Sequence, residues 1–145
     1  MYKHILVPVD GSSTALQAVR QAVDIASTYG SAVTAIYVID PYPFTGVATE
    51  LAYGQAEYLT AAKAEAQEAL AIVRTQVEAA GLKVDARMVE AHATWRGIVE
   101  TADAIKADLV VMGSHGRHGL EKLVLGSVTQ RVLQHATQPV LVVRG

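Results

Sequence analysis

Short, continuous apolar runs alternate along this chain with longer stretches in which apolar residues recur every three or four positions. The first pattern is typical of strands buried on both faces, and the second is typical of amphipathic helices. The runs that predict strands are residues 4–9, 32–39, 82–89, 108–112 and 139–143. Four helical stretches separate these runs without any tandem hairpin, so we expect an α/β fold.

Five strands joined by four helices predict a parallel, doubly wound sheet with helices on both faces. Crossovers between parallel strands are right-handed, which leaves few possible strand orders, and the expected order is 3-2-1-4-5. In this order a crevice opens between the carboxyl ends of the first and fourth strands. The longest predicted helix covers residues 57–80, and residues 40–56 are interpreted as a loop. Residues 1–145 are expected to form a single domain.

The ends of the predicted helices carry recognisable signals. Either Ser12 or Ser13 is expected to cap the first helix, and Gly30 is expected to end it. Thr94 and Ser127 are the expected caps of the third and fourth helices. These signals place the strand-to-helix junctions, where ligands of doubly wound folds bind, within a few residues.

The composition excludes several classes of function. Lysine and arginine number 12 against 14 acidic residues, for a formal charge of −2, so binding to nucleic acid is not expected. The chain has no cysteine, which excludes disulfides, thiol catalysis and thiolate metal sites. It also has no apolar run of about 18 residues, and its first apolar run is too short for a signal peptide, so we expect a cytoplasmic protein without membrane insertion.

A glycine-rich segment follows the fourth predicted strand. Gly113 and Gly116 are separated by two residues, and Gly116 and Gly126 by nine, with Gly126 at the start of the last helix. Glycine permits positive φ angles and lets a ligand lie against bare amides, while a helix start offers free N–H groups and hydroxyls to an anion. This segment and Asp10 would meet at the crevice, which predicts a phosphate cradle. It contains neither the P-loop pattern nor GxGxxG, and its spacing alone names no nucleotide.

The same segment has the spacing Gly, two residues, Gly, nine residues, Gly-Ser that marks the universal stress protein family. Together with KHILVPVDGS at 3–12, YVID at 37–40 and the sequence of 126–144, it makes the whole chain resemble the ATP-binding branch of that family. The resemblance implies ATP, with Mg²⁺ or Mn²⁺ bridging its phosphates. The residues that would line the ATP site are Pro8, Asp10, Val38, Gly113, Gly116, Gly126, Ser127, Val128 and Thr129.

The resemblance also implies a role for each of these residues. Pro8 and Asp10 would lie beside the nucleotide, and the backbone of Val38 would contact adenine. Gly113 and Gly116 would line the ribose and phosphates, and the four residues from Gly126 onward would hold the phosphate tail. A carboxylate at this place suits ribose hydroxyls or a hydrated Mg²⁺.

Three charged or titratable residues of the glycine-rich segment allow two interpretations each. Arg117, His115 and His118 either donate to the phosphates or are solvated loop residues, and Arg117 is included among the candidate binding residues. The chain has no G-x-S-x-G and no histidine pair spaced for a metal, so neither a catalytic triad nor a side-chain metal site is predicted. No catalytic residue is assigned, and hydrolysis of ATP is expected to be negligible.

The expected function is therefore a nucleotide-dependent regulatory module of the stress response. The alternatives are a slow ATPase and a nucleotide-free dimeric interaction protein. Residues 139–143 would form an apolar edge strand, and pairing with a second copy would protect that edge from aggregation. Relatives in the family commonly dimerise through this strand, so a homodimer is expected.

Overall fold

The computed structural model describes residues 1–41, 52–116 and 124–145, with the backbone alone at residues 52 and 53. Arg117, His118 and most of the predicted 40–56 loop lie outside the described residues. The elements in chain order are β1 (His4–Pro8), α1 (Ser13–Tyr29), β2 (Ala32–Ile39), α2 (Ala52–Ala79), β3 (Val84–Glu90), α3 (Thr94–Ala104), β4 (Leu109–Gly113), α4 (Ser127–His135) and β5 (Val140–Val143).

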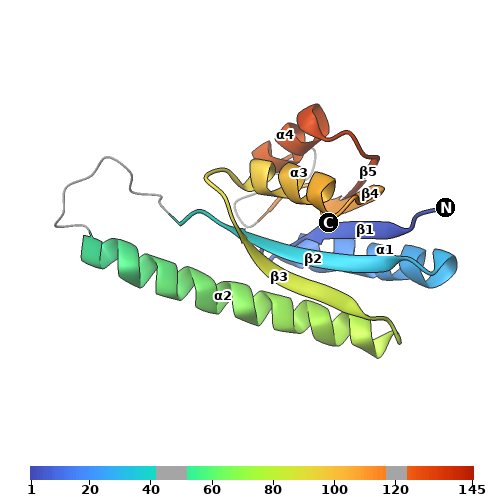
Figure 1. Cartoon of the computed structure of the whole chain (residues 1–145), viewed down its shortest axis with the longest axis horizontal. Helices are drawn as coiled ribbons and strands as arrows, with labels where there is room; N and C mark the ends of the chain where they lie inside the picture. Colours follow the sequence, from blue (N-terminus) through green and yellow to red (C-terminus); the bar gives the residue numbers. More distant parts are fainter. Residues whose placement is uncertain (42–51, 117–123) are drawn as a thin grey trace.

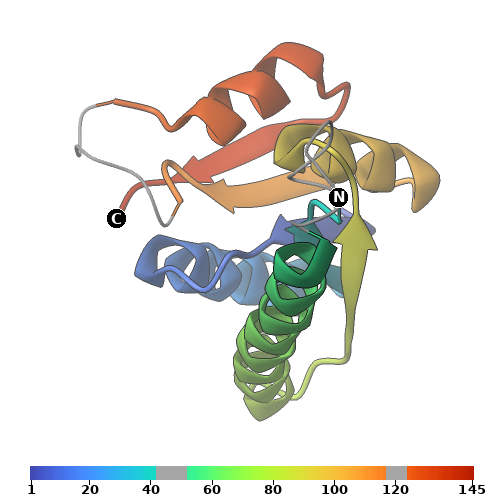
Figure 2. The same cartoon turned by 90° about the vertical axis from the view of Figure 1, so that its left-hand side faces the viewer.

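The strands form a parallel five-stranded sheet in the order β3-β2-β1-β4-β5, which confirms the predicted fold. The central strand β1 pairs with β2 on one side and β4 on the other, so that Ile5 lies opposite both Val33 and Leu109. Helices α1 and α2 cover one face of this sheet, and α3 and α4 cover the other (Figures 1 and 2). Strands β2 and β3 are added on one side of β1, and β4 and β5 on the other, so the switch point of the sheet lies between β1 and β4, as the predicted order requires.

Each face of the sheet has its own apolar core, and successive residues of a strand serve opposite cores. Ile5 and Val7 pack with α1 and α2, whereas Leu6 between them packs with α3 and α4. This alternation explains why the central strands appear in the sequence as continuous apolar runs. The edge strand β3 is half-buried or exposed along its length.

Two of the predicted helix caps are wrong. Ser12 does cap α1, since its side chain accepts a hydrogen bond from the Ala15 amide at 3.2 Å, and Gly30 ends that helix with a φ of 68°. The N-caps of α3 and α4 are instead Ala93 and Gly126, and neither makes a side-chain hydrogen bond. Thr94 and Ser127, which were predicted as caps, are the first helical residues, because the extended backbone before each helix ends one residue earlier than predicted.

The 28-residue helix α2 begins at Ala52, five residues before the predicted start, and therefore includes the end of the predicted loop. Among its described side chains, from residue 54 onward, the buried ones all lie in the second half: Ala66, Ala69, Leu70, Val73 and Val77. The first half extends past the carboxyl edge of the sheet (Figure 1), where its residues line a cavity. Within the described ranges, no helix is both long and apolar enough to cross a membrane.

Candidate functional site

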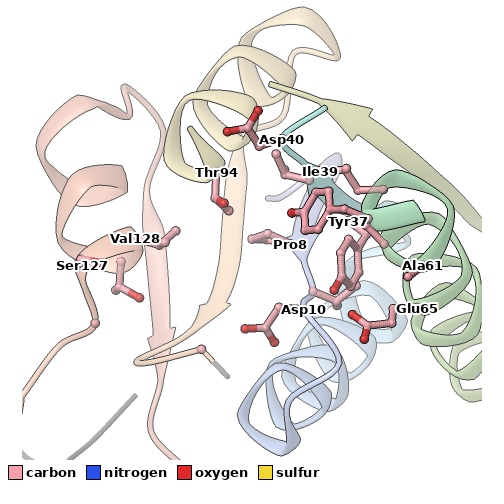
Figure 3. A pocket seen from close by; sticks show the side chains of 17 residues that line it. Pro8, Asp10, Tyr37, Ile39, Asp40, Ala61, Glu65, Thr94, Ser127 and Val128 are labelled. Atoms are coloured by element: carbon pink, nitrogen blue, oxygen red, sulfur yellow. The ribbon is translucent and has the colours of Figure 1, made fainter. Parts of the chain in front are cut away.

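A cavity of about 560 Å³ lies at the carboxyl ends of the central strands, where the doubly wound fold places its crevice. The end of β1, the end of β2, the first half of α2, the start of α3 and the start of α4 contribute its walls. Figure 3 shows Ser127 and Val128 on one side of this cavity and Ala61 and Glu65 on the opposite side. The two sides come from segments that are far apart in the sequence.

Most of the predicted site residues line this cavity. They are Pro8, Asp10, Val38, Gly116, Gly126, Ser127, Val128 and Thr129. Gly113 lines a smaller cavity of about 80 Å³ that shares Pro8, Gly116 and Thr129 with the larger one. Arg117 lies outside the described residues, so its predicted place remains a prediction. The structure thus brings together residues of β1, β2 and α4 that lie far apart in the sequence, from Pro8 to Thr129.

At the start of α4, residues 126–129 present hydrogen-bond donors to the cavity, and we call these four residues the donor end. The first hydrogen bond of the helix runs from the Gln130 amide to the Gly126 carbonyl at 3.0 Å. The amides of Ser127, Val128 and Thr129 precede this bond, so they have no acceptor within the helix. Because these N–H groups carry the positive end of the helix dipole, the donor end suits an anion.

The hydroxyl groups of Ser127 and Thr129, both in the donor end, differ in their surroundings. The Thr129 hydroxyl donates a hydrogen bond to the Gly113 carbonyl at 2.9 Å, and its side chain is 2% exposed. The hydroxyl proton of Thr129 is thus used within the protein, and the predicted contact between this residue and a ligand stays a prediction. Ser127 is exposed on the cavity wall, where its hydroxyl can donate to a ligand (Figure 3).

The three described glycines of the segment, Gly113, Gly116 and Gly126, are needed for close approach and not for unusual backbone angles. Among the described glycines, positive φ angles occur only at positions 11, 30 and 81. A Cβ atom on Gly116 would collide with the Asp10 carboxylate, and one on Gly113 would lie 2.7 Å from Cγ2 of Thr14. At Gly126 it would lie 3.2 Å from Cα of His115. These three glycines therefore pack tightly against α1, against Asp10 just after β1, and against His115 of the same segment.

In the part of the chain that the structure describes, three carboxylates from other segments line the same cavity, and we call them the carboxylate wall: Asp10, Asp40 and Glu65 (Figure 3). Asp10 is oriented by the Ser12 amide, which donates to its Oδ1 at 3.0 Å, and Asp40 lies 3.6 Å from Nδ1 of His92. Among the described residues, no cationic side chain lines the cavity, and no group of acidic and histidine side chains is arranged to hold a metal ion.

Several lining residues were missed by the sequence analysis. They are Val9, Tyr37, Ile39, Asp40, Tyr58, Ala61, Ala62, Glu65 and Thr94. Residues 37–40 were quoted only for their resemblance, although the crevice rule applies to every residue at the end of a central strand. The spacing of Tyr58, Ala62 and Glu65 places them on one helix face, but nothing in that pattern says which element the face meets.

His115 bridges two elements. Its Nε2 lies 3.2 Å from the Thr14 hydroxyl of α1, and its Nδ1 lies 3.1 Å from the Ser114 hydroxyl. The side chain lines the smaller cavity and not the larger one. Neither predicted role describes it, since both ring nitrogens already have partners within the protein. Its companion His118 lies outside the described residues.

The sheet order, the crevice and the donor end define a class of protein: a doubly wound α/β protein with a polyanion-compatible cavity at its switch point. The model of the universal stress protein family matches residues 1–144. A universal stress protein of Methanocaldococcus jannaschii is 43% identical over 144 residues, which cover 99% of this chain and 83% of that protein. The chain belongs to the universal stress protein family.

Solved structures agree with this assignment. The universal stress protein UspA from Lactobacillus plantarum superposes with a TM-score of 0.87 and 30% identity, covering 99% of this chain and 98% of that one. A universal stress protein crystallised in complex with cAMP gives a TM-score of 0.73 and 27% identity, covering 99% of this chain and 97% of that one. The fold of this chain is therefore shared with members of the family over nearly their whole length.

Proposed function

We propose that this protein binds ATP in the 560 Å³ cavity and acts as a nucleotide-dependent regulatory module in the stress response. The observation that carries the proposal is the donor end, where three consecutive helix-start amides without helical acceptors line a cavity of the size that small ligands occupy. The relative in complex with cAMP supports a nucleotide as the ligand class. The proposal requires a compartment that contains ATP, for which the cytoplasm is our expectation.

The roles of the lining residues follow from their chemistry. The phosphates would lie against the amides of residues 127–129, with the Ser127 hydroxyl as a further donor. The adenine would lie near Pro8 and the backbone of Val38, and the Asp10 carboxylate would accept from ribose hydroxyls. Gly113 and Gly116 would allow the backbone to approach the ligand, and Arg117 would add a positive charge beside the phosphates.

The charge of the cavity favours a metal–nucleotide complex over free ATP. Three carboxylates line the cavity, and direct contact between a carboxylate and a phosphate is repulsive. Mg²⁺ or Mn²⁺ fits this arrangement when it is held by the phosphates and keeps most of its water, because Asp10 can accept hydrogen bonds from that water. The metal would neutralise the negative charge of the phosphates, since no cationic side chain among the described residues lines the cavity to do so.

Calorimetry with ATP, ADP and GTP, with and without Mg²⁺, tests the proposal. We expect heat of binding with Mg²⁺–ATP and weaker binding when EDTA removes the metal. If well-folded protein gives no heat with any of the three nucleotides, the proposed function is wrong, and the alternative of a nucleotide-free interaction protein takes its place.

We further propose that the protein holds ATP without hydrolysing it efficiently. Phosphoryl transfer needs a residue that orients the attacking water, and Asp10, to which we assign the ribose, is already held by the Ser12 amide. Binding without extra stabilisation of the transition state gives slow turnover, well below about 1 s⁻¹. Single-turnover assays should show intact ATP after minutes. Rapid phosphate release that Asp10→Ala abolishes would identify a slow or moderate ATPase instead.

Finally, we propose a homodimer formed through residues 139–143. Strand β5 is an edge of the sheet, and Leu141 on it is 38% exposed. The carbonyls of Pro139 and Val143 accept hydrogen bonds from the amides of Val110 in β4 and of Ser114 just after it. Because alternate residues of a strand face the neighbouring strand, Val142 directs its N–H outward. Val142→Pro removes that outward donor at an edge, where proline is tolerated. Light scattering should give a dimer mass for the parent protein and a monomer mass for this variant. A parent monomer at micromolar concentration would contradict the proposal.

A further inference from the structure

Two hydrogen bonds fix the start of α4 to the end of β4. The Gly126 amide donates to the Ser114 carbonyl at 2.8 Å, and three residues later the Thr129 hydroxyl donates to the Gly113 carbonyl at 2.9 Å. The two attachment points are about 4.5 Å apart along the helix axis, at a rise of about 1.5 Å per residue. One point alone would leave the helix free to pivot, whereas two points fix the direction in which its first amides point.

The β4 end to which α4 is attached is itself held on two sides. The Ser114 amide donates to the Val143 carbonyl of β5 at 2.8 Å, and His115 contacts the Thr14 hydroxyl of α1 at 3.2 Å. A Cβ atom at Gly113 would lie within 2.7 Å of the same threonine, so the backbone there is packed directly against α1. The Gly113 carbonyl is therefore a fixed anchor, and a hydroxyl bound to it is fixed as well.

We propose that Thr129 is a positioning residue for phosphate recognition: its hydroxyl does not touch the ligand but aims the amides of Ser127 and Val128 into the cavity by holding the first turn of α4 on Gly113. This inference rests on the proposed nucleotide binding. Hydrogen bonds to a phosphate depend on direction, and a small misplacement of preorganised donors costs much of their affinity.

Two other roles for Thr129 predict different results. If its hydroxyl were a direct phosphate ligand, its loss would weaken ATP binding without loosening the ligand-free helix start. If it were only a buried polar group, its loss would lower stability without changing the affinity for ATP. The three roles are separated by measuring ATP affinity, stability and amide exchange on the same variants.

The experiment compares Thr129→Val, Thr129→Ser and the control Thr34→Val. Valine keeps the shape of threonine but removes the donor, and serine restores the donor. Thr34 is a matched control because it is 1% exposed, its hydroxyl lies 2.7 Å from Nε2 of His4, and it does not line the cavity. We expect Thr129→Val to weaken Mg²⁺–ATP binding about tenfold or more, with both Thr129→Ser and Thr34→Val within about threefold of the parent.

Amide hydrogen exchange in the ligand-free protein gives a second readout that needs no nucleotide. We expect the Gly126 amide to exchange about tenfold faster in Thr129→Val and at the parent rate in Thr34→Val. If the parent protein binds no ATP but this acceleration appears, the proposed function fails while the holding role of Thr129 stands. Unchanged exchange together with weakened ATP binding indicates a direct ligand, and unchanged ATP affinity in Thr129→Val overturns the inference.

Discussion

The donor end and the carboxylate wall line one cavity, but they are built in opposite ways. The donor end, residues 126–129, offers backbone amides whose direction is fixed by hydrogen bonds to β4. The wall offers the side chains of Asp10, Asp40 and Glu65, which come from three separate segments. A backbone site tolerates changes of side chain but not of backbone position. A side-chain site can be altered one charge at a time. The two ends should therefore respond differently to substitution.

The largest effect is expected where a new side chain would disturb the packing of Gly116 against Asp10. In Gly116→Val, the Cβ atom would collide with Oδ2 of Asp10, so either the Asp10 side chain leaves the Ser12 amide that orients it or the backbone at Gly116 shifts. We predict that Mg²⁺–ATP affinity falls by about a hundredfold or more, as measured by calorimetry, because preorganised binding groups are lost.

Gly54→Val is the matched control for this prediction. Gly54 lies in α2, and a Cβ atom there would meet nothing within 4 Å. Circular dichroism and thermal unfolding should show that both variants fold. If Gly116→Val binds Mg²⁺–ATP within about threefold of the parent, the donor end does not depend on the position of this backbone, and the contrast between the two ends is lost.

The same contrast explains what could be predicted from the sequence. The sheet order followed from the apolar runs and the right-handed crossovers, and the donor end followed from a glycine spacing that is local in the sequence. The wall was only partly found, because Glu65 reaches the cavity through the position of α2 over the sheet, which is a tertiary property. The inward direction of the Thr129 hydroxyl was missed because helical spacing does not say which side of a first turn faces the strand end.

A smaller effect is expected at the wall. Glu65 is exposed on α2 and opposes the approach of a polyanion, so we predict that Glu65→Gln raises Mg²⁺–ATP affinity about two- to threefold at low salt. Glu65→Lys should raise it further, and about 0.5 M salt should reduce both gains, since exposed charges are screened. Affinity is measured by calorimetry at two ionic strengths.

Glu68→Gln removes the same charge from the same helix at an exposed position that does not line the cavity, and it should leave affinity unchanged. A fall in ATP affinity for Glu65→Gln would mean that this carboxylate accepts a hydrogen bond from the base or the ribose. The wall would then be a recognition surface and not a source of repulsion.

The smallest effect on binding is expected at the opposite, amino end of the sheet. The Asp108 carboxylate accepts hydrogen bonds from the Lys3 amide at 2.9 and 3.1 Å and from the His4 amide at 3.0 Å. Burial acts to raise the pKa of Asp108, but the hydrogen bonds from these two amides outweigh it and lower the pKa below its usual value of 3.8. The ionised carboxylate thus holds the start of β1 against β4.

Because the pKa of Asp108 is lower in the folded protein than in the unfolded chain, its ionisation stabilises the fold at pH values above 3.8. This stabilisation is lost as the pH falls through the lowered value, where the folded protein also takes up the proton. We predict that Asp108→Asn costs about 1 kcal/mol of unfolding free energy at neutral pH, given that the site is only partly buried. The difference from the parent should shrink below pH 3.8, as measured by urea unfolding at several pH values.

The control is Asp24→Asn, at an exposed aspartate of α1, which should show neither the loss of stability nor its pH dependence. Both variants should bind Mg²⁺–ATP like the parent, because affinity is set at the carboxyl end of the sheet alone. A loss of affinity in Asp108→Asn would show that the two ends of β1 are coupled, and that the cavity does not act independently of the strand register beneath it.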